Sequence, residues 1–158
     1  IAQCLVGSEM CIRDRSYTTF SLEVVSSAIN GEDCEMKVAV KNTGERAGKE
    51  SVQLYVKAPA GGLEKPAKEL KAFAKTKLLK PGETEVVTLS WKLMDMASFN
   101  EKNSSWELTK GTYQWMAATS SADVRCTVDQ KVSKAQKVKV HDAMKPPYEI
   151  SELDMIKR

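Results

Sequence analysis

Short runs in which hydrophobic and polar residues alternate dominate the middle of the chain. Residues 34–42 place Cys, Met, Val and Val at every second position, with polar or small residues between them. Residues 51–56 and 85–91 repeat this alternation. A period of two is typical of an antiparallel strand with one buried face and one solvated face. We therefore predict a half-buried strand at each of these places.

Turn signals separate the predicted strands, among them Asn30-Gly31 and Pro81-Gly82. Residues 69–79 are rich in helix-forming side chains, but the Pro-Gly turn that follows at once favours a strand. A single short helical turn is expected at 94–98, and a short edge strand at 105–108. The remaining predicted strands are residues 18–25, 112–118 and 124–128. About seven short strands with frequent turns indicate an all-β chain folded as an antiparallel β-sandwich.

The charge pattern excludes one class of partner. Net charge is +3 over 158 residues, and residues 16–129 carry 15 acidic and 15 basic side chains. The basic excess lies in residues 130–158, so the predicted sandwich has no overall basic character. Nucleic-acid binding needs a basic face on the folded domain, and no apolar run approaches the length of a membrane span. We expect neither a nucleic acid nor a membrane as partner.

The four cysteines and the single histidine, His141, show no metal-ligand spacing. We therefore expect no metal and no cofactor. A disulfide between Cys34 and Cys126 requires their strands to lie close together. The other interpretation treats them as two unpaired, buried thiols that act as small apolar residues.

Three segments carry a resemblance to a known family: GKESVQLYV at 48–56, EKPAKEL at 64–70 and ATSSADVR at 118–125. They resemble the C-terminal fibronectin type III-like domain of family-3 glycoside hydrolases, the family of β-glucosidases and β-xylosidases. The resemblance covers residues 16–158 and implies a fibronectin type III or Ig-like topology. It also implies a strand at 69–79, which the Pro-Gly turn favours as well. It also implies that the catalytic carboxylates lie in other domains of a longer parent chain. We predict no catalytic residue here, and we interpret Glu35, Glu45, Glu83 and Glu101 as acids of solvated faces or turns.

Three parts are predicted along the chain. Residues 1–15 include CLVGSEMCIRDR, which resembles a translated sequencing adapter, and the family-like wording starts abruptly with SYTTF at 16–20. We expect residues 1–15 to be an artefact, residues 16–130 to form the sandwich, and residues 131–158 to form an extended C-terminal tail. In that tail, Ile150, Leu153 and Ile156 recur at every third position.

The predicted function is that of a non-catalytic accessory domain that braces the missing catalytic domains of a β-glucosidase-like parent. The parent would hydrolyse terminal β-linked sugars, and this chain would meet such sugars only through it. The family implies a periplasmic or secreted parent. The candidate contacts to the catalytic domains are charged residues of the family-like segments: Lys65, Lys68, Glu69, Asp123 and Arg125.

Two other functions remain open from the residues alone. NTGERAGKESVQLYV at 42–56 also resembles independent Ig-like modules that bind or adhere at cell surfaces, although no internal repeat is present. A carbohydrate-binding module needs a row of exposed aromatic residues on one face. Four aromatic residues are predicted instead to fill the core or an interface: Tyr55, Trp91, Tyr113 and Trp115.

Overall fold

The computed structural model describes residues 16–141 except 62 and 64. The artefact predicted at 1–15 and the tail residues 142–158 therefore lie outside the described residues. Within the described part, strands make up most of the chain, with two short 3-10 helices between them. The elements are β1 (Phe20–Asn30), β2 (Asp33–Asn42), β3 (Ser51–Lys57), β4 (Glu69–Lys75), β5 (Thr84–Lys92), η1 (Leu93–Met96), β6 (Ser98–Asn100), η2 (Glu101–Asn103), β7 (Ser105–Leu108), β8 (Gly111–Ala118), β9 (Val124–Val132) and β10 (Gln136–Lys139).

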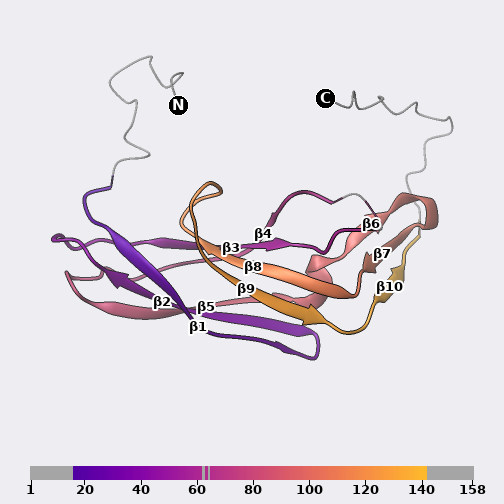
Figure 1. The fold of residues 1–158 in the computed structure, drawn as a ribbon, viewed down its shortest axis with the longest axis horizontal. Helices are drawn as coiled ribbons and strands as arrows, with labels where there is room; N and C mark the ends of the chain where they lie inside the picture. The colour runs from indigo at the N-terminus through magenta and orange to yellow at the C-terminus, as the bar shows by residue number, and fades with distance from the viewer. Residues whose placement is uncertain (1–15, 62, 64, 142–158) are drawn as a thin grey trace, which may run out of the picture.

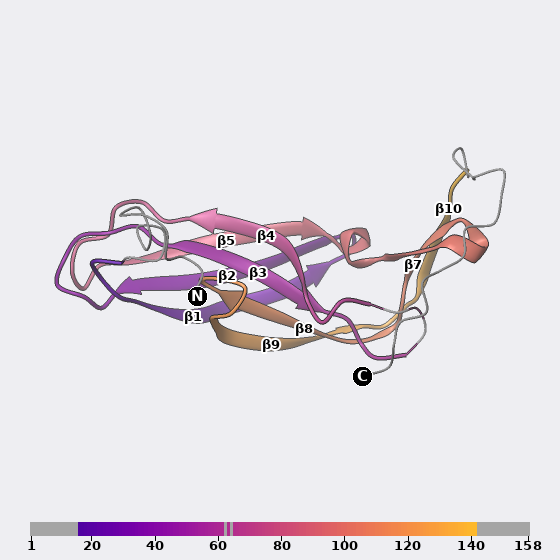
Figure 2. The same cartoon turned by 90° about the horizontal axis from the view of Figure 1, so that it is seen from above.

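Two antiparallel sheets form the body of the domain, with strand orders β1-β2-β5 and β4-β3-β8-β9. The four-stranded sheet lies above the three-stranded one in Figure 1. A third, small sheet of order β10-β7-β6 projects from one end of the sandwich (Figure 2). The predicted all-β sandwich is thus confirmed. The described residues contain ten strands rather than about seven: seven form the two main sheets, and β6, β7 and β10 form the projecting sheet.

The core lies between the two main sheets, on the faces that the alternating patterns make apolar. Trp91 of β5 and Trp115 of β8 meet there in an edge-to-face pair, with ring centroids 4.5 Å apart and planes at 73°. Aromatic pairs in this geometry contribute roughly 0.5–1.5 kcal/mol beyond the burial of their area. Tyr113 is buried as well. Three of the four aromatic residues predicted as filler therefore hold the sheets together, whereas Tyr55 lies half-buried in β3.

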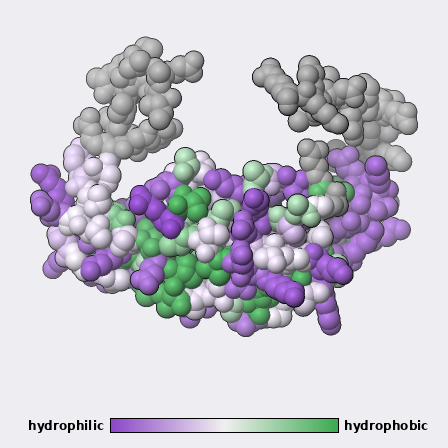
Figure 3. Space-filling model, in the orientation of Figure 1, coloured by the Kyte–Doolittle hydropathy of each residue, from purple (hydrophilic) through white to green (hydrophobic). Residues whose placement is uncertain are grey.

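Edge strands β1 and β9 close one side of the sandwich. The Cys126 thiol donates to the Leu22 carbonyl at 3.1 Å, and the Gln130 amide donates to the Ser27 hydroxyl at 2.7 Å. Hydrophobic surface in the middle of the face shown in Figure 3 lies over these two strands. A bulge between Val24 and Ser26 interrupts the β1–β2 register, which is why alternation predicts only the first part of β1.

Two predicted strands form with differences from the prediction. Of the strand predicted at 69–79, Glu69–Lys75 form β4, which pairs with β3 along its length, and residues 76–79 lie beyond its end. Residues 105–108 form β7, as predicted, but β7 lies in the centre of its sheet rather than at an edge. Its second neighbour is β10, residues 136–139. The sequence around β7 does not predict this pairing.

Asn42, at the end of β2, is fully buried with every hydrogen-bonding group of its side chain satisfied. Its Oδ1 accepts from the Thr18 hydroxyl at 2.7 Å and from the Gly44 backbone N–H at 3.0 Å. Its Nδ2 donates to the carbonyls of Arg46 and Leu79, each at 2.8 Å. One side chain thus joins the approach to β1, the turn after β2 and the segment that leads to β5.

Cys34 and Cys126 are not joined by a disulfide. Cys34 is buried in β2, and burial, assisted by the nearby Asp33 and Asp95 carboxylates, raises the pKa of its thiol to about 11. Burial also raises the pKa of the half-buried Cys126 thiol. The interpretation as a buried, unpaired thiol that acts as a small apolar residue therefore fits Cys34, whereas Cys126 is half-buried and donates a hydrogen bond to Leu22.

Candidate functional site

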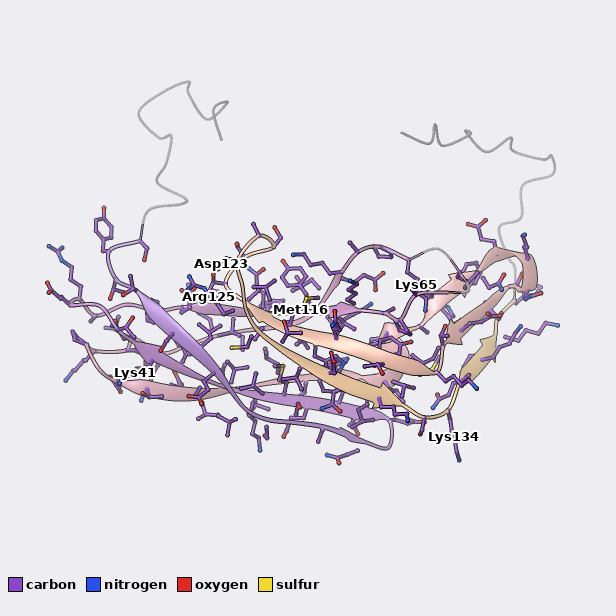
Figure 4. All side chains as sticks on the ribbon, in the orientation of Figure 1. Lys41, Lys65, Met116, Asp123, Arg125 and Lys134 are labelled. Carbon is purple, nitrogen blue, oxygen red and sulfur yellow. The ribbon has the colours of Figure 1, made fainter. Side chains whose placement is uncertain are left out.

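Three of the five predicted contact residues border one surface, the outer face of the β4-β3-β8-β9 sheet. The Lys68 ammonium lies 5.3 Å from the ring centroid of Tyr55 and donates to the Ser121 carbonyl. Asp123 and Arg125 lie close together where β8 turns into β9 (Figure 4). Lys68 therefore links the loop before β4 to the β8–β9 turn across this face.

The Asp123 carboxylate is the most strongly bonded group of this surface. It accepts from the Thr119 hydroxyl at 2.7 Å, and from Nε and Nη2 of Arg125 at 2.9 and 2.7 Å. These hydrogen bonds, that from Thr119 first, hold the pKa of Asp123 below its usual range. Both partners of the ion pair stay half exposed, so the pair contributes little to the stability of the isolated domain. A protein surface that covers the Asp123–Arg125 pair would contact two charges whose positions are already fixed.

Apolar side chains on the same sheet add to this surface. Phe73 of β4 is 75% exposed, the most exposed large hydrophobic residue of the described chain. It lies opposite Gln53 of β3, while Tyr55 lies opposite Met116 of β8. Figure 4 shows Met116 between Asp123 and Lys65. The name "outer face" is kept below for the surface formed by Tyr55, Lys68, Phe73, Met116, Asp123 and Arg125.

Lys65 and Glu69, the other two predicted contacts, take part in a separate brace. The Lys65 ammonium donates to the Thr109 hydroxyl at 3.0 Å, and burial lowers its pKa against the opposing effect of Glu69. Glu69 forms an ion pair with Lys71 at 2.5 Å, and the Lys71 side chain is only 14% exposed. The Tyr113 hydroxyl completes the brace by donating to the Thr109 carbonyl at 2.9 Å. The Lys65–Thr109 hydrogen bond fixes the loop before β4 to the β7–β8 connection, while the other two contacts order the start of β4 and the start of β8.

Sequence reasoning missed two residues of these sites. Lys71 occupies a register irregularity of β4, and the extra residue of a bulge breaks the alternation from which its orientation would be predicted. Phe73 could have been found, because it lies between Ala72 and Ala74, both of which pack against the core. In KAFAK, residues 71–75, alternation therefore predicts that the Phe73 ring faces solvent.

Several of the described carboxyl groups are engaged in structural pairs. Glu35 pairs with Lys37 at 3.2 Å, and Glu83 pairs with Lys77 at 3.1 Å. The carboxyl groups with a clearly shifted pKa, which are Glu83, Glu107 and Asp123, are all shifted downward by hydrogen bonds and lysine or arginine partners. A glycosidase needs one carboxylic acid with a raised pKa, facing a second carboxylate across the scissile bond. These three carboxyl groups have the opposite electrostatic character.

Three further features of the described residues bear on chemistry. Glu45, Glu101 and His141 are exposed, the histidine beyond the end of β10. No group of three or more His, Cys, Asp or Glu side chains suited to a metal ion occurs among residues 16–141, with 62 and 64 left aside. In the same part of the chain, no helix has the length and apolar character needed to cross a membrane.

Comparison with known proteins gives one consistent result. Residues 50–121 match the fibronectin type III-like domain family. β-Glucosidase A of Butyrivibrio fibrisolvens is 43% identical over 70% of this chain and 16% of its own length. The β-glucosidase of Kluyveromyces marxianus is 39% identical over 75% of this chain and 14% of its own length.

Solved structures agree with these relatives. β-Glucosidase 3B of Thermotoga neapolitana, in complex with glucose, has a TM-score of 0.75 and 39% identity over 80% of this chain and 17% of its own. A β-glucosidase of Paenibacillus barengoltzii has a TM-score of 0.75 and 34% identity over 82% of this chain and 16% of its own. The chain thus spans about a sixth of the length of these proteins. It belongs to the fibronectin type III-like domains that family-3 β-glucosidases carry.

Proposed function

We propose that this chain is a non-catalytic accessory domain of a β-glucosidase-like glycoside hydrolase and packs against the catalytic domains of the same parent protein. The observation that carries the proposal is that β-glucosidases match this chain over only about a sixth of their length. In this proposal the parent hydrolyses terminal β-linked sugars, and the domain contacts such sugars only through the parent.

The carboxyl groups of the described chain support a role without catalysis. Ion pairs and hydrogen bonds hold Glu83, Glu107 and Asp123 in their charged forms. A carboxylate held in this way is a poor proton donor to a departing sugar oxygen. The adhesion module considered from the sequence gains no support, because the relatives named above are β-glucosidases.

The outer face is the surface that we assign to the catalytic domains. It combines an exposed aromatic ring, Phe73, with the oriented pair of Asp123 and Arg125 and with Lys68. Aromatic and arginine side chains are the residues that most often dominate binding energy at protein interfaces. In this proposal Lys65 acts through its hydrogen bond to Thr109, which fixes the loop from which Lys68 extends, and Glu69 acts by holding Lys71 at the start of β4.

We further propose that the parent is exported to the periplasm or the medium. The support is the family resemblance alone, since this family acts on sugars from outside the cell. Sequencing the full-length gene tests the proposed export, because an exported parent should carry an export signal. A complete gene without such a signal would contradict the proposal of export and leave the accessory role untouched.

The accessory role is tested by assaying this 158-residue chain on aryl β-glucosides beside the full-length protein. Folding of the chain is checked by a cooperative thermal transition. We expect a folded chain without turnover and an active full-length protein. Turnover by the chain that persists through purification would contradict the proposal and would require a catalytic pair within these residues.

A further inference from the structure

The small sheet presents a second apolar surface, which the proposed function does not use. Phe99 of β6, Trp106 of β7 and Val138 of β10 are direct cross-strand neighbours, so they form one row across all three strands. They are 42%, 45% and 48% exposed. The Phe99 and Trp106 ring centroids lie 5.3 Å apart. A contiguous exposed apolar row is a candidate interaction surface.

A groove of about 820 Å³ continues this row toward the sandwich. Its lining residues are Glu69, Leu70, Lys71, Met94, Asp95, Ala97, Trp106 and Val138. The polar groups among them already have partners, because Glu69 pairs with Lys71 and the Asp95 carboxylate accepts from the Lys92 backbone N–H at 2.9 Å. The surface left for a ligand is therefore mainly aliphatic and aromatic. Such a surface suits the apolar side chains of a peptide better than the hydroxyl groups of a sugar.

The chain itself continues from the edge of this surface. The Val140 backbone N–H donates to the Ser104 carbonyl at 2.9 Å, which extends the contact of β10 with the rest of the small sheet. The last described residue, His141, is only three positions beyond Val138. Seventeen residues follow, 142–158, with an extended reach of roughly 55 Å. A tethered segment this near acts at an effective concentration of about millimolar, so weak contacts suffice to hold it.

The composition of this segment complements the groove. Ile150, Leu153 and Ile156 recur at every third position, and side chains at this spacing share one side of a helical turn. Five of the residues that line the groove are apolar: Leu70, Met94, Ala97, Trp106 and Val138. The apolar positions of the segment thus match the groove in kind.

We propose that residues 142–158 dock on the apolar row and groove of the small sheet, with Ile150, Leu153 and Ile156 against Trp106, Leu70 and Val138. The segment then covers Trp106 within the same chain. Docking of an amphipathic segment in an apolar groove is a recognised mode of peptide binding, in which apolar anchors every three or four residues fill the groove. This inference is independent of the proposed function, because it concerns only contacts within the chain.

Tryptophan fluorescence tests the proposal directly. Trp91 and Trp115 are buried, at 6% and 0% exposure, so acrylamide quenching of the folded chain reports mainly on Trp106. The test variant is the complete chain with Ile150→Ser, Leu153→Ser and Ile156→Ser. The matched control is Met144→Ser, which removes an apolar side chain of the same segment outside the proposed stripe.

We expect the triple variant to show a larger quenching constant and a red-shifted emission, while the control matches the natural sequence. Adding Trp106→Phe should abolish the difference between the triple variant and the natural sequence. The melting temperature, set by the sandwich, serves as the check that every variant is folded. Equal quenching of the triple variant and the natural sequence would overturn the proposal. Protection of Trp106 that appears only as protein concentration rises would overturn it too, since a second copy would then be the occupant.

Discussion

Replacing Asn42 by alanine should destabilise the domain more than any comparable change of an exposed asparagine. The substitution removes four hydrogen bonds of 2.7–3.0 Å from a side chain with no exposed area. At a typical net contribution of about 1 kcal/mol each, the sum is about 4 kcal/mol. Two groups keep or regain a partner: the Leu79 carbonyl still accepts from the Gly48 N–H at 3.0 Å, and the half-buried Thr18 hydroxyl can reach water. The expected loss in free energy of unfolding is therefore about 3 kcal/mol.

Urea denaturation followed by tryptophan fluorescence measures this loss, because Trp91 and Trp115 lie in the core. In thermal melting, about 3 kcal/mol corresponds to a decrease of roughly 10 °C for a domain of this size. Asn103→Ala is the matched control, since Asn103 is exposed and has no side-chain hydrogen bond among the described residues. The control should change stability by less than about 0.5 kcal/mol. A loss below about 1 kcal/mol for Asn42→Ala would refute the reasoning.

Asn42→Asp tests the two hydrogen bonds that Asn42 donates separately from the two that it accepts. Aspartate keeps the size of asparagine and both acceptor contacts, but it replaces the donor Nδ2 with an oxygen. That oxygen would face the carbonyls of Arg46 and Leu79 at distances now near 2.8 Å. We expect the aspartate variant to be less stable than the alanine variant at neutral pH, by the same urea assay. Equal stability of the aspartate variant and the natural sequence would show that the two donated hydrogen bonds contribute nothing.

Three further predictions follow from local geometry. Gly44→Ala should lower the melting temperature by several degrees, because its Cβ would lie 2.2 Å from the Thr18 hydroxyl oxygen; an unchanged melting temperature would contradict this close contact. Hydrogen bonds from Lys137 and Asn100 lower the pKa of Glu107 to about 2, so its stabilising effect is present above the unfolded pKa and is lost as pH falls from about 4.5 toward 2. An NMR titration of the Glu107 carboxyl with a midpoint near 4 would oppose that assignment. A variant with Cys34 as its single cysteine should react slowly with a thiol reagent at pH 8 until it is unfolded, because burial raises the thiol pKa to about 11; fast labelling of the folded chain would show that Cys34 is accessible.

Local patterns were sufficient to predict the main strands. The alternation of residues 34–42 identifies β2 and its buried face, which the structure confirms from Cys34 to Val40. The strand at 69–79 was predicted from the Pro81-Gly82 turn together with the family resemblance, and β4 occupies Glu69–Lys75 of that range. For β2, by contrast, the deciding information lies within ten residues.

Long-range pairing could not be predicted in this way. The row of Phe99, Trp106 and Val138 forms because β10 pairs with β7 across about thirty residues, and no local pattern encodes that partner. The buried network of Asn42 was likewise hidden, since Asn42-Thr43-Gly44 indicates only a turn. Lys68 and Asp123 were named as candidates from family-like wording, but their place beside Phe73 on one face depends on the order of strands in the sheet.

The most direct test of the central claim compares Phe73→Asp in this chain and in the full-length parent. Phe73 is 75% exposed here, so the change should alter the stability of the isolated chain by less than about 0.5 kcal/mol. If the outer face packs against the catalytic domains, the same change buries an unpaired charge in the parent and should lower its melting temperature and its activity on aryl β-glucosides. A parent that tolerates Phe73→Asp as well as the isolated chain does would contradict the assignment of this face as the contact with the catalytic domains.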